Sequence, residues 1–91
     1  MLEAALEQRC CKYAKKVGCW ALKLWPTVTG LPDRLVLMPG GRVWFVEFKA
    51  PQGRISKRQV VVMSLLLDMG FRVTVVRDFK SFAEGLDRLP L

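Results

Sequence analysis

The sequence predicts one α/β domain over residues 1–91, with a small mixed β-sheet flanked by helices in the order α-β-β-β-α-β-α. Three observations support this fold class. β-rich runs alternate with segments of helical periodicity, and a Pro-Gly-Gly turn separates two of those runs, which is typical of a hairpin. A capped helix separates the last two strands, and such a crossover makes neighbouring strands parallel.

Leu2 to Val17 is expected to form the first helix, because its apolar residues recur at helical spacing and Gly18 follows as a stop. Cys19 to Trp25 alternates between two sets of side chains until Pro26 ends the pattern, so we expect a strand there. Residues 27–32 are expected to form a loop.

Two further strands are expected at 34–38 and 42–49, on either side of the Pro-Gly-Gly turn. A three-residue turn pairs Met38 with Arg42, and the same register places Asp33 opposite Glu47. Period-two alternation then puts Asp33, Glu47 and Lys49 on one face of the hairpin.

Residues 50–55 form a Pro/Gly-containing loop, and Ser56 followed by Gln59 has the form of a capping box. We expect this box to open a helix that runs to Met69 and ends at Gly70. Residues 71–76 are expected to form the last strand and residues 80–87 a short final helix.

The net charge of +7 is concentrated in one part of the chain. Residues 9–58 hold eleven lysines and arginines against two acids, a local charge of +9, while residues 59–91 are neutral. A basic face of this kind favours a nucleic-acid partner over an anionic membrane surface, although the charge could also serve solubility alone. No run of residues is long and apolar enough to span a bilayer, so we expect no membrane segment.

The chain has no histidine, which excludes histidine zinc ligands, histidine general bases and the Ser-His and Cys-His nucleophile pairs. Cys10, Cys11 and Cys19 lie among apolar residues and are expected to be small core side chains. The N-terminus lacks the pattern of a signal peptide. We therefore expect a reducing, intracellular location: the cytoplasm of a bacterium or of a phage-infected host cell.

Glu47 and Lys49 lie on a strand that is otherwise nearly all apolar, where burying either charge unpaired would cost several kcal/mol. They could form a plain ion pair on a solvated face. If Asp33 lies beside Glu47, however, the two carboxylates repel unless a cation separates them. With neither histidine nor a nearby cysteine as ligand, that cation should be Mg²⁺ or Mn²⁺. Such a site in a basic protein fits phosphodiester hydrolysis, with Lys49 orienting water or neutralising charge on the phosphate.

These residues resemble a known family. Gly30-Leu31-Pro32-Asp33 followed by Glu47-Phe48-Lys49 resembles the PD-(D/E)xK nuclease superfamily, which has a restriction-endonuclease-like core. The segments 51–59 and 70–73 narrow the resemblance to the virus-type replication-repair nuclease (VRR-NUC) domain, over roughly residues 7–76. The resemblance implies a metal-dependent, structure-specific DNA endonuclease.

The resemblance also implies a role for single residues. It implies metal ligation by Glu7, Asp33, Glu47 and the backbone carbonyl of Phe48, and catalytic roles for Asp33, Glu47, Lys49 and Gln59. Glu3 is the substitute candidate for the first-helix ligand. Two of these residues have a simpler explanation, since Glu7 could be a solvated helix residue and Gln59 the partner of Ser56 in the cap.

Arg54, Lys57 and Arg58 stand at a predicted helix N-terminus, where cations oppose the helix dipole. Bound phosphate would reverse that penalty, so we expect these three residues to contact DNA. Trp20, Trp25 and Trp44 are expected to lie in the core or in contacts with a second subunit rather than between bases.

The sequence-based hypothesis is a homodimeric, Mg²⁺- or Mn²⁺-dependent endonuclease that acts on branched DNA, specifically a Holliday junction resolvase. A short chain that is 52% hydrophobic gains from the buried surface of a dimer. One alternative is a flap or branched-DNA nuclease that acts as a monomer or in a complex. Another is a nucleic-acid-binding module in which the carboxylates are purely structural.

Overall fold

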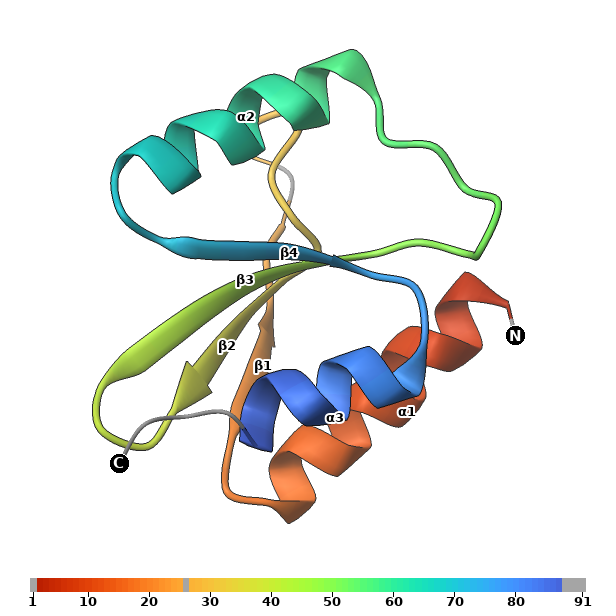
Figure 1. The fold of residues 1–91 in the computed structure, drawn as a ribbon, viewed down its shortest axis with the longest axis vertical. Coiled ribbons are helices and arrows are strands. Elements are labelled where there is room, and N and C mark those ends of the chain that lie inside the picture. The colour runs from red at the N-terminus through yellow and green to blue at the C-terminus, as the bar shows by residue number, and fades with distance from the viewer. Residues whose placement is uncertain (1, 26, 88–91) are drawn as a thin grey trace.

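The computed structural model describes residues 2–25 and 27–87 and has the expected α/β fold (Figure 1). The elements occur in the predicted order: α1 (Glu3–Lys16), β1 (Trp20–Lys23), β2 (Arg34–Met38), β3 (Arg42–Phe48), α2 (Lys57–Asp68), β4 (Arg72–Val76) and α3 (Phe79–Asp87). The first strand was predicted too long, since β1 ends at Lys23 and not at Trp25. The Leu24 N–H still donates to the Asp33 carbonyl, and the chain then enters the loop.

The four strands form one sheet in the order β1-β2-β3-β4. β2 pairs antiparallel with both β1 and β3. β3 and β4, which precede and follow α2 in the sequence, pair in parallel. Met38 pairs with Arg42, which confirms the predicted three-residue hairpin turn. Gly40 and Gly41 have φ angles of +84° and +74°, a conformation that residues other than glycine rarely adopt.

One face of the sheet carries the core, covered by α1 and α3, which lie side by side (Figure 1). Trp44 is at its centre, with its ring stacked on Phe82 at 5.3 Å between centroids and the Arg72 guanidinium 4.1 Å from the ring centroid. Cys10 and Cys19 are buried as expected, and Cys11 packs against the core. Burial raises the pKa of Cys10 to about 12, so this thiol stays protonated and unreactive.

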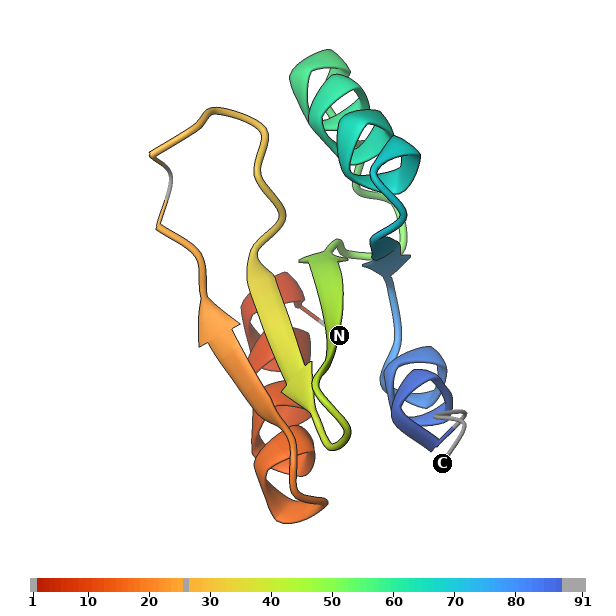
Figure 2. The same cartoon turned by 90° about the vertical axis from the view of Figure 1, so that its left-hand side faces the viewer.

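The other face of the sheet is apolar but only half-buried. By alternation it carries Leu22, Leu35, Phe45 and Val73, each partly exposed. In Figure 2, α1 lies behind β1 and β2, and no helix lies in front of these strands. α2 is on this side of the sheet but packs mainly on β4, and Val62 is its one buried residue.

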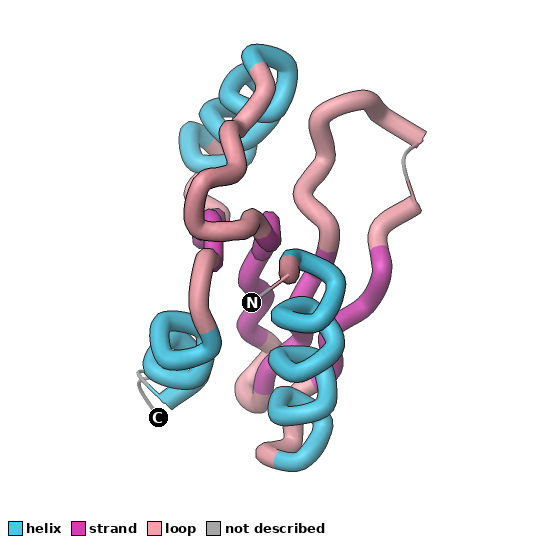
Figure 3. The backbone as a smooth tube through the Cα atoms, turned by 90° about the vertical axis from the view of Figure 1, so that its right-hand side faces the viewer, coloured by secondary structure: helices cyan, strands magenta, loops and turns pink. Residues whose placement is uncertain are grey.

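The loop between β1 and β2 rises from the same end of the sheet as α2 (Figures 2 and 3). Gly30 is the point of contact, because a Cβ atom built there would lie 2.8 Å from the carbonyl oxygen of Arg58 and 2.9 Å from Val62 Cγ2. Only glycine permits this approach, and its φ of +96° also favours glycine. Arg58 Nε donates a hydrogen bond to the carbonyl of Thr29 at 3.1 Å and closes the contact.

The three tryptophans differ from one another in position. Trp44 lies in the core as expected, but Trp20 and Trp25 are 64% and 74% exposed, so a core position was wrong for both. Trp20 begins β1 on the half-buried face, and Trp25 lies in the loop, where no packed layer covers it. A contact with a second subunit stays a prediction for these two residues.

Across residues 2–25 and 27–87, no helix has the length and apolar character needed to cross a membrane.

Replacing Gly85 in α3 with alanine should destabilise the protein, although alanine is the better helix former by about 1 kcal/mol. The added Cβ would overlap the buried Trp44 indole and lie 3.0 Å from Arg72 Nη2. Overpacking of this kind costs about 1–3 kcal/mol, and each kcal/mol lowers Tm by roughly 4–8 °C in a domain of this size. Lys80→Ala, an exposed substitution in the same helix, is the control for thermal denaturation. A Gly85→Ala protein as stable as wild type would contradict the packing described around Trp44.

Candidate active site

Asp33 and Glu47 are brought together by the hairpin register. Arg34 pairs with Val46, so the next position along the ladder places Asp33 opposite Glu47, as predicted. The Asp33 carboxylate is fixed there, because its Oδ2 accepts a hydrogen bond from the backbone N–H of Phe48 at 2.9 Å. Pro32, fully buried, precedes it and restricts the backbone.

Glu47 is a buried carboxylate with one satisfied and one unsatisfied oxygen. The residue is 3% exposed. Its Oε2 accepts a hydrogen bond from Gln59 Nε2 at 2.7 Å and lies 3.4 Å from Lys49 Nζ. Within the described part of the chain, Oε1 is one of two buried side-chain polar atoms without a hydrogen-bond partner. Such an atom costs about 1–3 kcal/mol, and more when the group is charged.

The surroundings of Glu47 disfavour its ionised form. Burial raises the pKa of Glu47 above its ordinary value of 4.5, and the charge of Asp33 raises it further. The hydrogen bond from Gln59 and the charge of Lys49 act in the opposite direction without cancelling the shift. A divalent cation between Asp33 and Glu47 would offset both the repulsion and the unsatisfied oxygen, so this donor set fits Mg²⁺ or Mn²⁺.

The side-chain amide of Gln59 takes part in both the helix cap and the candidate active site. Its Oε1 accepts from the backbone N–H of Ser56 at 3.0 Å, and Ser56 Oγ accepts from the Gln59 N–H at 3.1 Å, which confirms the capping box. Its Nε2 donates to Glu47. The cap thus fixes which end of the amide faces the carboxylate, and the two interpretations offered by the sequence are compatible.

Lys49 is held by the end of β4 and by the residue that follows this strand. Its backbone N–H donates to the carbonyl of Val76 at 3.0 Å. The next residue, Arg77, donates from Nη1 to the carbonyls of Ala50 and Gly53 at 2.9 and 2.7 Å, and so fixes the turn directly after Lys49. Sequence reasoning missed Arg77, since the only available signal was an arginine placed directly after the last strand.

Glu7 lies on α1 and forms ion pairs with two basic side chains. Its Oε2 accepts from Arg34 Nε at 2.8 Å and from Lys23 Nζ at 3.2 Å. In residues 2–25 and 27–87, no three acidic or thiol side chains come close enough together to hold one metal ion. Glu7 is therefore not grouped with Asp33 and Glu47 in this arrangement, and its substitute Glu3 is exposed in the first turn of α1. The role of Arg34 as the partner of Glu7 was also missed from the sequence.

The three predicted DNA contacts lie at the start of α2. Arg54 and Lys57 are exposed, and Arg58, also exposed, uses its Nε atom to bind the loop at Thr29. All three side chains are near the capped helix end that carries Gln59, so their charges lie on the same side of the molecule as the site.

Comparison with known proteins identifies the family of this chain. The sequence matches the VRR-NUC domain family over residues 3–79, and the chain belongs to this family. It is 35% identical over 75 residues to "Putative nuclease p44" of Acyrthosiphon pisum secondary endosymbiont phage 1, a match that covers 81% of each chain. It is also similar to a solved structure described as a VRR_NUC domain, with a TM-score of 0.86, 25% identity and 99% of each chain covered.

Replacing Glu47 with glutamine should stabilise the metal-free protein at neutral pH, or at least leave its stability unchanged. The substitution removes a buried charge whose ionised form the fold disfavours, while the oxygen of the introduced amide can still accept from Gln59. In thermal denaturation with EDTA we expect the variant to melt no lower than wild type. Adding Mg²⁺ should raise the Tm of wild type and leave that of the variant nearly unchanged, because binding to the folded state alone stabilises it.

A marked loss of stability in the metal-free Glu47→Gln protein would contradict this account of the site. Lys80→Ala again serves as the control, since it should respond to Mg²⁺ as wild type does.

Proposed function

We propose that this protein is a metal-dependent endonuclease that cuts branched DNA, specifically four-way junctions, as a homodimer. The observation that carries the proposal is Glu47, a buried carboxylate with an unsatisfied oxygen, set opposite Asp33 and 3.4 Å from Lys49. Membership of the VRR-NUC family and the relative named as a nuclease support the same chemistry.

Asp33, Glu47 and the backbone carbonyl of Phe48 would hold the Mg²⁺ or Mn²⁺ ion. When bound, the ion would polarise the phosphate and lower the pKa of the attacking water. Glu7 is not grouped with these ligands among the described residues, and its contacts with Arg34 and Lys23 both use the Oε2 atom.

Lys49 is the residue proposed to act on the phosphate. Its side chain is 18% exposed, so it can reach a bound phosphodiester while Glu47 fixes its position. There it would orient the attacking water or neutralise the charge that develops on the phosphate oxygens. Gln59 holds Glu47 and acts as a positioning residue.

The DNA backbone would run over the start of α2. Arg54 and Lys57 present exposed charges there, and Arg58 lies one position further. The charge of +9 within residues 9–58 supports a polyanionic partner whose affinity falls with salt. We also propose that the protein acts inside a bacterial cell, a phage-infected host included, and its similarity to a protein from a phage supports this location.

The direct test is cleavage of a fluorescently labelled four-way junction in Mg²⁺. We expect wild type to cut, and Lys49→Ala to cut about 10²–10³-fold more slowly, because it loses charge stabilisation in the transition state. Lys80→Ala removes an exposed lysine of α3 that pairs with Glu84 and should cut at the wild-type rate. EDTA should abolish cleavage by every variant.

The same experiment separates the alternatives when duplex, flap and junction substrates are compared. A protein that cuts flaps but leaves junctions intact is a flap nuclease. Binding without cleavage, unaffected by EDTA or by Asp33→Ala, would identify a module with structural carboxylates. Either result overturns the junction proposal.

The homodimer is supported by apolar surface that one subunit leaves uncovered. Residues 60–67 of α2 contain no charged side chain, and a helix that is apolar all round is normally buried. Here Val60, Val61, Leu65 and Leu67 are about half exposed. A groove between α2 and β4, lined by Ile55, Met63 and Val75 among others, adds a cavity of about 280 Å³ on the same side. A two-fold dimer through this surface would present two sites to a two-fold junction.

Replacing Leu67 with lysine should dissociate the dimer, because it puts a charge into the proposed contact. Leu67 is 53% exposed, so the fold of one subunit should tolerate the change. Val17→Lys is the matched control: Val17 is 42% exposed but lies at the C-terminal end of α1. Light scattering after size exclusion should give a dimer for wild type and Val17→Lys and a monomer for Leu67→Lys. A monomeric wild type at micromolar concentration would contradict the dimer.

A further inference from the structure

We propose that the pocket beside Asp33 binds one unpaired nucleobase of the DNA, stacked on Trp25, next to the phosphate that is cut. The inference rests on the proposed function and adds to it: the preferred substrate has an unstacked nucleotide at the cleavage position. The pocket has a volume of about 280 Å³ and lies between the end of β1 and the loop that leads to Asp33.

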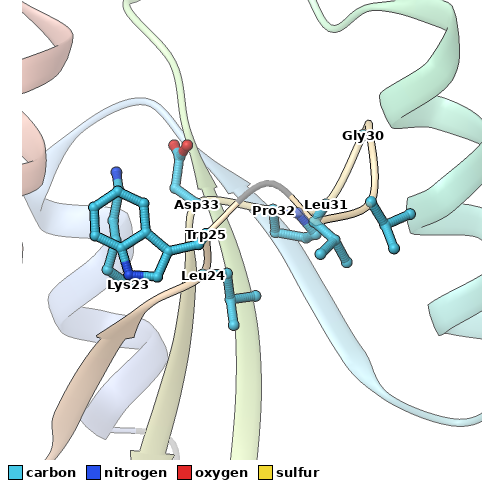
Figure 4. Close-up of a pocket in the computed structure, with 8 residues that line it drawn as sticks. Lys23, Leu24, Trp25, Gly30, Leu31, Pro32 and Asp33 are labelled. Atoms are coloured by element: carbon cyan, nitrogen blue, oxygen red, sulfur yellow. The ribbon is translucent and has the colours of Figure 1, made fainter.

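The pocket contains both an apolar wall and the proposed metal ligand. Figure 4 shows the Trp25 indole and the Asp33 carboxylate at the base of the loop, with Leu31 and Pro32 further along it. Since Asp33 itself lines the pocket, a base bound there belongs to a nucleotide whose phosphate lies at or beside the metal site. Lys23 also lines the pocket and brings a cation to its rim.

The Trp25 indole is exposed, and hydrogen bonds hold the backbone around it. The residue before it, Leu24, donates its N–H to the carbonyl of Asp33 at 3.0 Å, and Thr27 donates to the carbonyl of Trp25 at 2.7 Å. The indole is 74% exposed, and among the described residues none of the close aromatic pairs includes it. A ring held by its backbone and open on its faces gains by stacking on a base without a large cost in ordering.

The volume and the chemistry of the pocket select a single unpaired base. Drug-sized ligands occupy pockets of about 300–1,000 Å³, so 280 Å³ leaves room for one planar ring system. Inside a duplex both faces of every base are already stacked, so a base enters the pocket only when its nucleotide is extruded, at a cost that is lowest where the base is already unpaired. Aromatic stacking accepts any of the four bases, which suits an enzyme that reads DNA shape.

The test is a binding cycle on four-way junctions in which an abasic nucleotide is moved through the positions that flank the branch point. The proteins carry Lys49→Ala so that the DNA stays intact, and Kd is measured in Mg²⁺. We expect Trp25→Ala to weaken binding to the intact junction by roughly 5- to 150-fold, the equivalent of 1–3 kcal/mol for one stacked base. Trp25→Phe should retain most of the affinity. Trp20→Ala, which removes the other exposed tryptophan near β1, should bind as the parent does.

The abasic position provides the decisive comparison. At one position the parent should lose affinity by a similar factor, and Trp25→Ala should cause no further loss on that DNA. Equal effects of Trp25→Ala on intact and abasic junctions, or no effect at all, would overturn the proposal. A Trp25→Ala protein that has become monomeric would also overturn it, because Trp25 would then be a subunit contact. Failure of wild type to cut junctions refutes the proposed function instead, and leaves the binding cycle to decide on the base site.

Discussion

A charged carboxylate buried in a 91-residue domain is the constraint around which the site is built. Glu47 is 3% exposed, and its neighbours have opposite effects on its ionisation. Gln59 and Lys49 stabilise its ionised form, while Asp33 destabilises it. Its Oε1 atom is buried and has no hydrogen-bond partner among the described residues. The fold thus maintains at its own cost an anionic position that a divalent cation can neutralise, a common arrangement where function and stability compete.

Local sequence signals were enough to predict the frame of this site. The Pro-Gly-Gly turn fixes the hairpin register, and the register alone brings Asp33 opposite Glu47. The capping box fixes the first turn of α2 and therefore the position of Gln59. Such signals depend on backbone geometry within a few residues, so they can be recognised without knowledge of the tertiary packing.

Contacts between distant segments could not be predicted in this way. Nothing near Glu7 in the sequence indicates that Arg34, 27 residues later, will occupy its carboxylate. Trp20 and Trp25 are large apolar residues of the kind that usually lie in a core, yet both are exposed while Trp44 is buried. The reason is that α1 and α3 cover only one face of the sheet. Exposure depends on which layers are present on each side, and a strand pattern does not contain that information.

Because Arg77 comes late in the sequence, the contacts that it makes at the site can form only when most of the chain has been synthesised. A growing chain that has emerged only as far as α2 already contains Asp33, Glu47, Lys49 and Gln59. It lacks the Val76 carbonyl that holds the Lys49 backbone and the guanidinium that fixes the following turn. Both come from the end of β4 and the residue that follows it, where β4 pairs in parallel with β3. An unfinished or truncated chain therefore has the chemical groups of the site without their geometry, and only the finished fold is equipped to act on a nucleic acid.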